Sequence, residues 1–520
     1  MSIRWFIRRA TTPRGFGGLH PLLFAGYPVL FLWSQNVAEL SPGEVVPPFI
    51  VVVVITTLAT AAVGFLLSDR RRAALIVTPV VLGALLYGHI ASVTGVSEEI
   101  RQASWLGVVV LGAIGAVRLG SRRLADIDTA LLRLGIVALA VPLVMIVPVE
   151  IEDALVRPAS ARATERIAQT ATDAPKRDVY WIVLDRYGSD RSFQLRFGAT
   201  NTFTPWLRER GFAVLDDSHA NYVATSLSMA TTLNMAHLEE LTGLVGSGSS
   251  SYTPVYARLQ APSVVEQFKV LGYRYLHLGS WWNPTRTDVA ADVNYNADPQ
   301  PEIVSLLVEY SVAPRVAETF DLEGVAPSES AKHLKHNRYA LDTLDDLRDE
   351  PGPKFVLAHI LLPHPPYVFD RDGRYIPVEE AATLDETDAW QRQLDYTNLR
   401  LRAFVEGLLA LPEADRPIII LQADEGPWTE PYAADKVNYD WQTASPEELE
   451  MKFGILNAWY VPGADLGLDP AMTAINTFPV LFDRYFGLDQ TLLADRVTAS
   501  AGWQRPYQLT DVTERLPSLE

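Results

Sequence analysis

The pattern of hydrophobic and polar positions divides this chain of 520 residues into two parts. Up to about residue 150, long apolar runs are interrupted only by short polar patches. From residue 178 onward, short apolar runs alternate with segments of helical periodicity. The first pattern is typical of membrane-spanning helices, and the second predicts an α/β domain. Residues 151–177 are polar and rich in Ala and Arg, so we expect a juxtamembrane connector there.

The first part, residues 1–150, is expected to form a transmembrane bundle of about five helices. A span needs roughly 20 apolar residues. The two shortest runs reach that length by tilting or by extending their flanking arginines to the interface. A soluble helical domain is the alternative, but soluble helices keep a polar face, and Val46–Leu67 has none. The expected spans are Gly17–Asn36, Val46–Leu67, Ala73–Val93, Ser104–Val117 and Leu134–Val149.

Charges in the connections orient this bundle. Basic residues precede the first run and recur in every second connection, whereas the other connections hold four glutamates and one arginine, Arg101. By the positive-inside rule the N-terminus is cytoplasmic. Five spans then place residues 178–520 outside, in a multi-pass protein of the cell membrane. The basic residues are Arg4, Arg8, Arg9, Arg14, Arg70, Arg71, Arg72, Arg118, Arg122 and Arg123.

The second part, residues 178–520, alternates expected strands and helices as an α/β domain does. The expected strands are Val179–Asp185, Ala213–Asp216, Tyr273–Leu278, Phe355–Ile360, Ile418–Ala423 and Leu456–Val461. The expected helices are Pro205–Arg210, Ser263–Leu271, Ser328–Arg348, Ala389–Ala410 and Ala474–Phe486.

Composition excludes several kinds of function. The formal net charge of −18 argues against nucleic acid as a partner, because phosphate backbones require a basic face. The absence of cysteine excludes disulfides, cysteine-ligated zinc and a cysteine nucleophile.

Acidic residues follow two of the expected strands. Asp185 comes directly after one apolar run, and Asp424 and Glu425 come directly after another. Ligands of open α/β sheets bind beyond the carboxyl ends of the strands. Adjacent acids there repel each other unless a cation lies between them. They are therefore candidate metal ligands, and the alternative, ordinary capping or turn acids, stays open.

Hydroxyl and imidazole groups supply further candidates. Thr225 begins a run of small polar residues that suits the N-terminus of a helix, where an anion is favoured. It is either a nucleophile activated by a metal or a simple helix cap. His364 lies between prolines just beyond a strand, where it would face a ligand. His277 and His359, within strands, are expected to be structural or to support the site.

A family resemblance rests on an ordered set of motifs over essentially the whole chain. They are VYWIVLDRYG, TPWLRERGF, SHANYVATSLSMATTLNM, GYRYLHLGSWWNPT, HILLPHPPYVFD, IIILQADEGP, LNAWYVPG and INTFPVLFDRYFG. The succession resembles the sulfatase-like branch of the alkaline phosphatase superfamily. It is most similar to the membrane-anchored, lipoteichoic-acid-synthase-like group. The resemblance implies an extracytoplasmic α/β/α sandwich after the transmembrane bundle.

The resemblance also implies roles for individual residues. Asp185 and Asp424 would be metal ligands, Thr225 the metal-bound nucleophile, and His364 a substrate-binding residue. The superfamily usually has histidine after the second aspartate, whereas this chain has Glu425. A glutamate there can still bind a metal, and it shifts the preference from Zn²⁺ towards Mn²⁺ or Mg²⁺.

The implied function is a sulfatase-like hydrolase or transferase that is membrane-bound and metal-dependent. It would move a phospho-linked headgroup to a lipid or glycan of the cell envelope, with a membrane lipid or lipid-linked polymer as partner. The standard sulfatase nucleophile motif is absent. Two alternatives stay open: a phosphoethanolamine-transferase-like modification of a surface lipid, and, because of Glu425, an inactive sulfatase-fold binding module.

Overall fold

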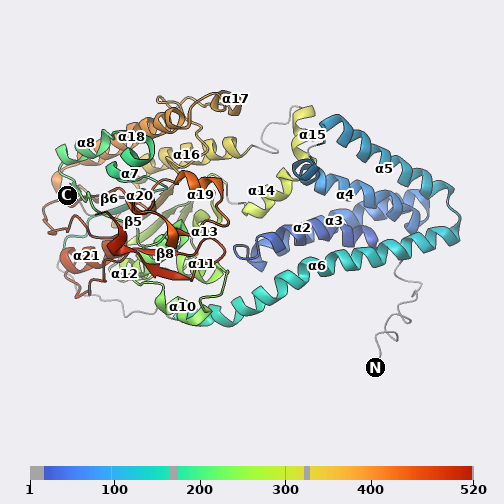
Figure 1. The fold of residues 1–520 in the computed structure, drawn as a ribbon, viewed down its shortest axis with the longest axis horizontal. Helices are drawn as coiled ribbons and strands as arrows, with labels where there is room; N and C mark the ends of the chain where they lie inside the picture. Colours follow the sequence, from blue (N-terminus) through green and yellow to red (C-terminus); the bar gives the residue numbers. More distant parts are fainter. Residues whose placement is uncertain (1–16, 95, 163–173, 299, 321–327, 518–520) are drawn as a thin grey trace. The chain divides into compact units, whose positions relative to one another are not determined.

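The computed structural model of the chain describes residues 17–94, 96–162, 174–298, 300–320 and 328–517, which form two compact units (Figure 1). The first unit comprises Met1–Glu152 and Gln300–Ser328. The second comprises Asp153–Pro299 and Glu329–Glu520. Residues 300–320 thus group with the first unit, although the sequence pattern placed them in the C-terminal domain. The sequence-derived boundaries at 150 and 178 stay a prediction, because the division into compact units does not show where a membrane would end.

The first unit is helical, as expected. Four of its helices are long and apolar enough to cross a membrane. The first expected span forms a helix of only 16 residues, which is shorter than a span needs. The other four expected spans lie in the four long apolar helices, and their crossing of a membrane stays a prediction. Arg4, Arg8, Arg9 and Arg14 lie outside the described residues. The helices are α2 (His20–Gln35), α3 (Pro42–Leu67), α4 (Arg70–Thr94), α5 (Glu98–Arg118) and α6 (Ser121–Arg162).

Helix α3 shows why these helices suit a bilayer. It begins with a capping box in which Ser41 and Glu44 satisfy each other's backbone N–H groups. Beyond that turn its apolar side chains point outward, and Val51, Ile55 and Leu58 are each more than half exposed. Water does not tolerate such a continuous apolar surface, whereas lipid chains do.

Two short helices from the middle of the sequence complete the first unit: α14 (Glu302–Glu309) and α15 (Ala313–Thr319). Ile303 is fully buried in an apolar cluster with residues of α2 and α3. Between the two helices, the Tyr310 carbonyl accepts a hydrogen bond from the Gly88 N–H of α4 (2.8 Å), and the Val312 N–H donates to the Ala84 carbonyl (2.7 Å). The loop after α14 is therefore joined to α4 by backbone hydrogen bonds.

The second unit is built on a seven-stranded sheet of order β2-β7-β6-β1-β5-β3-β4. Strands β6, β1, β5, β3 and β4 are parallel, whereas β7 and β2 run antiparallel at one edge. All six expected strands are present within three residues at either end. The expected α/β class is thus confirmed. The strands are β1 (Val179–Leu184), β2 (Ala213–Val214), β3 (Arg274–Leu278), β4 (Val293–Tyr295), β5 (Lys354–Ile360), β6 (Ile418–Ala423) and β7 (Asn457–Tyr460).

Helices pack on both faces of this sheet, and β1 shows how. Its side chains alternate between the two faces. Tyr180 contacts Phe404 of helix α18 (Glu386–Leu409), and Trp181 contacts Phe478 of α21 (Thr477–Val480) on the other side. Every residue of β1, β5 and β6 is buried, which is why each reads as a continuous apolar run.

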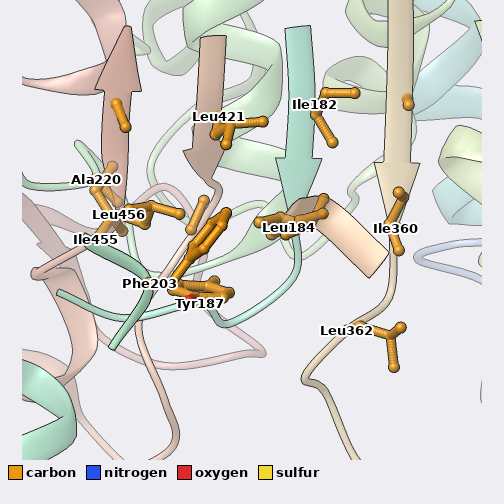
Figure 2. Packing of buried hydrophobic residues seen from close by; sticks show 14 of the residues in the cluster. Ile182, Leu184, Tyr187, Phe203, Ala220, Ile360, Leu362, Leu421, Ile455 and Leu456 are labelled. Atoms are coloured by element: carbon orange, nitrogen blue, oxygen red, sulfur yellow. The ribbon is translucent and has the colours of Figure 1, made fainter. Parts of the chain in front are cut away.

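The carboxyl ends of the parallel strands lie at one edge of the sheet. Figure 2 shows β6, β1 and β5 ending side by side, with Leu421, Leu184 and Ile360 near their ends and Tyr187 and Phe203 packed just beyond. This apolar packing supports the turns that follow the strands, and those turns carry the acidic residues.

Four of the five expected helices are confirmed, and the fifth, Ala474–Phe486, is broken into η4 (Ala474–Asn476), α21 and η5 (Leu481–Tyr485). The confirmed helices are α8 (Phe203–Glu209), α12 (Ser263–Val270), α16 (Glu329–Asp346) and α18. Helix α9 (Thr225–Asn234) begins where the sequence indicated a helix N-terminus. Elements that were not expected are α7 (Asp190–Phe197), α10 (Glu239–Val245), α11 (Thr253–Leu259), α13 (Asn283–Arg286), α17 (Val378–Ala381), α19 (Glu430–Ala434), α20 (Pro446–Phe453), β4, β8 (Thr498–Ser500) and β9 (Leu509–Asp511).

Candidate active site

Three strand ends meet at this site. The Asp185 N–H, directly after β1, donates to the Ile360 carbonyl at the end of β5 (3.0 Å). Asp424 and Glu425 follow β6, the other parallel neighbour of β1. The sequence pattern predicted that these acids share one rim. Asp185 and Asp424 do lie together, and His359 of β5 joins them, because one ligand atom from each of the three lies within 4.8 Å of the other two.

These three residues fit a metal ion. Oδ1 of Asp185, Nε2 of His359 and Oδ2 of Asp424 are buried, and none has a hydrogen-bond partner among the described residues. Arg186 Nε lies 3.7 Å from Asp185 Oδ1 as an ion-pair partner. Buried polar atoms without hydrogen bonds are costly in a protein interior. Two carboxylates and one imidazole are a common ligand set for Zn²⁺ or Mn²⁺. The donor chemistry therefore suits a divalent cation, and it does not select one ion.

The electrostatics agree with this assignment. Burial and the neighbouring Asp424 charge raise the pKa of Asp185 well above its usual value. Burial and the Glu425 charge raise the pKa of Asp424 to about 7. Burial lowers the pKa of His359 to about 3, so its imidazole is neutral and can act as a ligand. Both carboxyl groups would stay ionised more readily beside a bound cation.

His359 is a residue that the sequence analysis underestimated, since it was expected to be structural or to support the site. The Thr285 hydroxyl lies 2.7 Å from its Nδ1, which leaves Nε2 free to face the two aspartates. The sequence HILLPHPPYVFD has two histidines, and nothing in it tells which one faces the acids. The strand register decides this, because His359 pairs with Val183, two residues before Asp185.

Thr225 lies beside the acids as the first residue of α9. The N-cap position belongs to Ala224, so the Thr225 hydroxyl is not used to cap the helix. That hydroxyl is close enough to the Asp424 carboxyl group to lower its pKa as a hydrogen-bond donor. Thr225 also lines a cavity of about 320 Å³ together with Asp185 and Glu425.

Glu425 has two cationic partners. Arg186 Nε donates to its Oε1 (3.2 Å), and Lys452 Nζ lies 2.7 Å from its Oε2. Lys452 is almost completely buried, and burial lowers the pKa of its ammonium group. Glu425 is not in the group that can hold a metal among the described residues. Its role as a ligand stays a prediction, and in this arrangement both of its oxygens are already paired.

His364 lines the same cavity, as the sequence predicted for a residue that faces a ligand. Its ring centroid lies 5.8 Å from that of Trp428 and 6.1 Å from that of His333. Burial, followed by the charge of Arg186, lowers the pKa of His364 well below its usual value. Its role in substrate binding stays a prediction.

The other walls of the cavity are aromatic and basic. The Arg186 guanidinium lies 3.3 Å from the ring centroid of Trp428, and Lys436 Nζ lies 3.6 Å from the same ring. The sequence analysis did not single out Arg186, Lys436 or Lys452. The signal for Arg186 was its place directly after Asp185. Further aromatic lining comes from Trp281, Trp282, Tyr432 and Trp503.

Comparisons with known proteins found similar structures but no similar sequence. No protein-family model matches the chain, and no curated protein matches its sequence. The solved structures that it matches include members of the alkaline phosphatase and sulfatase superfamily, at sequence identities near 13%.

Three of these solved structures illustrate the match. The C-terminal periplasmic domain of EptC from Escherichia coli has 13% identity and a TM-score of 0.44, with 68% of this chain and 97% of that chain covered. The lipoteichoic acid synthase LtaP from Listeria monocytogenes has 14% identity and a TM-score of 0.37 (67% and 85% covered). An alkaline phosphatase superfamily protein from Vibrio parahaemolyticus has 13% identity and a TM-score of 0.37 (66% and 81% covered). Likeness at this level says nothing about substrate.

Proposed function

We propose that this protein is a membrane-bound, metal-dependent transferase or hydrolase that moves a phospho-linked headgroup through Thr225. One observation carries the proposal. Asp185, His359 and Asp424 bring buried ligand atoms that lack hydrogen bonds within 4.8 Å of one another. The Thr225 hydroxyl lies close to Asp424, and Thr225 lines the same cavity as Asp185. A hydroxyl next to such a ligand set has the arrangement of an activated nucleophile.

The chain's own residues define the steps. A bound divalent cation would supply Lewis acidity, which lowers the pKa of a hydroxyl and neutralises phosphoryl oxygens. Thr225 Oγ1 attacks phosphorus as the bond from phosphorus to the lipid oxygen breaks. The threonine proton ends on the departing lipid oxygen, and the headgroup phosphate stays on Thr225 as a phosphodiester. Water or an acceptor hydroxyl then attacks phosphorus, the bond to Oγ1 breaks, and the attacking group's proton returns to Thr225. His364, which stays neutral, lines the same cavity and is available to hydrogen-bond the headgroup. The protein acts mainly by positioning and electrostatics.

The substrate class is inferred from the apolar helices of the chain and from the aromatic walls of the cavity. Four helices of the chain are long and apolar enough to span a membrane, which favours a donor or acceptor held at a membrane surface. The aromatic walls suit the apolar faces of a glycerol or a sugar. We therefore infer a phospholipid or lipid-linked envelope polymer as substrate. Mn²⁺ or Mg²⁺ suits the two carboxylates, and His359 adds a ligand that Zn²⁺ accepts equally well.

A non-enzymatic function is the second candidate, and Glu425 is the observation that favours it. Arg186 and Lys452 already neutralise this residue, so it brings no free charge to a metal. A module that only binds an envelope polymer would still use the cavity. Transfer of a phosphoethanolamine group to a surface lipid is a special case of the first proposal, distinguished by the mass of the group transferred.

Mass spectrometry of the full-length protein tests the covalent step. The protein in nanodiscs is loaded with Mn²⁺ or Zn²⁺, incubated with phospholipids, quenched in acid and digested. We expect a phospho-linked adduct on the peptide that contains Thr225. Thr225→Ala should remove the adduct and the turnover, whereas Thr225→Ser, which keeps a hydroxyl, should retain both in part. Undiminished turnover in Thr225→Ala would refute the role of this residue.

A further inference from the structure

Arg186 has an unusual backbone conformation for an arginine. It follows Asp185 directly and adopts a positive φ of 62°, a region that residues with a Cβ rarely occupy. Its N–H donates to Oδ1 of Asp424 (3.2 Å), so the strained turn is tied to a candidate metal ligand. Backbone strain of this kind persists where the surrounding structure enforces it, and it is concentrated at functional sites.

The guanidinium of Arg186 is held from two sides. Its Nε donates to Glu425, and its plane lies over the Trp428 ring at 3.3 Å from the centroid. The side chain is only 10% exposed. A guanidinium that is stacked and paired at Nε keeps its two terminal nitrogens for another ligand.

One of those nitrogens has nothing to bond. Nη1 of Arg186 is buried and has no hydrogen-bond partner among the described residues, and Arg186 lines the cavity that contains Thr225. A buried charged donor without an acceptor is costly. An anionic oxygen in the cavity would satisfy it.

Lys452 determines whether the charge of Arg186 is available to such an anion. Glu425 alone would cancel it, but the buried Lys452 ammonium already compensates Glu425 from the other side. With all three carboxyl groups ionised beside a bound divalent cation, Asp185, Asp424, Glu425, Arg186, Lys452 and the cation would together carry one net positive charge. That charge matches a singly charged phosphodiester.

We propose that Arg186 binds a phosphoryl oxygen of the substrate, and that the buried Glu425–Lys452 pair positions it for this. Arg186 is then a catalytic residue that supplies a fixed positive charge beside the metal ligands. A planar guanidinium suits this task because it can pair with phosphoryl oxygens while Nε stays bonded to Glu425. The inference deepens the proposed function and relies on it for the metal.

Binding of inorganic phosphate tests the inference without requiring turnover. The metal-loaded full-length protein in nanodiscs is titrated with phosphate by calorimetry, and its metal content is measured in parallel. Arg186→Met should weaken phosphate binding by about 10- to 100-fold, the range for a charged hydrogen bond, while one metal ion stays bound. Arg210→Met is the matched control, because Arg210 also stacks on a tryptophan and pairs with a glutamate, away from the cavity.

Each result decides the question. A phosphate affinity within twofold of wild type in Arg186→Met with metal bound, or an equal loss in Arg210→Met, would overturn the inference. Should Arg186→Met fail to fold, Arg186→Lys decides it: we expect a loss of at least about threefold, because one ammonium cannot reach both Glu425 and the anion, and no loss would overturn the inference. Wild-type protein that binds phosphate through Arg186 but forms no Thr225 adduct would contradict the proposed function alone.

Discussion

Helix α3 and strand β6 are built from the same kinds of residue and place them in opposite surroundings. Ile55 of α3 is 61% exposed, whereas Ile420 of β6 is completely buried. The difference is length and context. A run of 26 residues forms a helix that is long enough to span a membrane and leaves most of its side chains uncovered by protein, whereas a run of six in a central strand is covered on both faces. An apolar run therefore predicts that its side chains avoid water. The length of the run predicts whether lipid or the protein core surrounds them.

The largest expected loss of stability comes from replacing isoleucine by alanine, and the same substitution in α3 and in β6 tests the comparison. Ile420→Ala removes a fully buried side chain, so we expect it to destabilise the second unit by about 2–5 kcal/mol. Ile55→Ala loses contact with lipid only, and we expect less than about 1 kcal/mol. Denaturant unfolding of the full-length protein, followed by tryptophan fluorescence, measures both. Equal losses would show that α3 is buried in protein.

Strand β6 also differs from α3 because buried acidic residues follow it. These residues should make the stability of the second unit depend on pH. The pKa of Asp424 is raised from 3.8 to about 7 by burial and by the Glu425 charge. Between these values the folded metal-free protein holds a proton that the unfolded chain has lost, so its stability falls as pH rises from about 4 to 7. Added Mn²⁺ or Zn²⁺ competes with this proton and should stabilise more at pH 8 than at pH 5.5.

Thermal melting in chelator and in metal, at both pH values, measures the effect, which we expect to be on the order of 2 kcal/mol. Asp424→Asn cannot ionise and should weaken both pH dependences, and the contribution of Asp185 remains. A metal-free melting temperature that rises steadily from pH 4 to pH 7 in the wild type would contradict the assignment.

The first unit also has a place where its side chains meet protein instead of lipid. A Cβ at Gly88 would lie 3.0 Å from the Glu309 carbonyl oxygen and from Tyr310 Cα. Gly88→Leu should therefore displace the α14–α15 segment, at a cost of about 1–3 kcal/mol. Limited proteolysis within residues 300–320 measures the release. Gly107→Leu in α5 is the control, because a Cβ there meets nothing within 4 Å; equal cleavage of both variants would show that the contact is unimportant.

The smallest expected loss of stability concerns the N-terminal cap of a helix in the second unit. Asp385 caps α18 by accepting a hydrogen bond from the Thr387 N–H (2.9 Å) in an exposed position. Asp385→Ala should cost about 1 kcal/mol, as for other N-caps. The denaturation midpoint of the second unit measures this loss. Asp385→Ser keeps the acceptor and should recover most of it, and an equal loss in both variants would argue against capping.

The parts of the molecule that sequence could predict are those decided locally. The apolar run Ile418–Ala423 and the acids that follow it give both a buried strand and its functional end. His359 could not be assigned, because its meeting with Asp185 depends on the register between β1 and β5. Arg186 and Lys452 were missed for a similar reason. Both pair with Glu425, and both lie far from Glu425 in the sequence, so only the tertiary structure shows the contacts.

The segment 300–320 shows the other limit of prediction. Its amphipathic pattern is compatible with a helix on any apolar surface, and only the tertiary structure joins it to α2, α3 and α4. The expected first span, Gly17–Asn36, is longer than α2 mainly at its start, because the helix begins only at His20.

Metal content of the purified full-length protein tests the central claim most directly, namely that Asp185, His359 and Asp424 hold one divalent cation beside Thr225. We predict one equivalent of bound ion by elemental analysis in the wild type and in the control His277→Gln, and its loss in Asp424→Ala and His359→Ala. His277 is the matched residue, since it is a buried strand histidine whose Nε2 is engaged by the Thr285 carbonyl (2.9 Å). No bound ion in the wild type under any loading condition, or full occupancy in His359→Ala, would contradict the account.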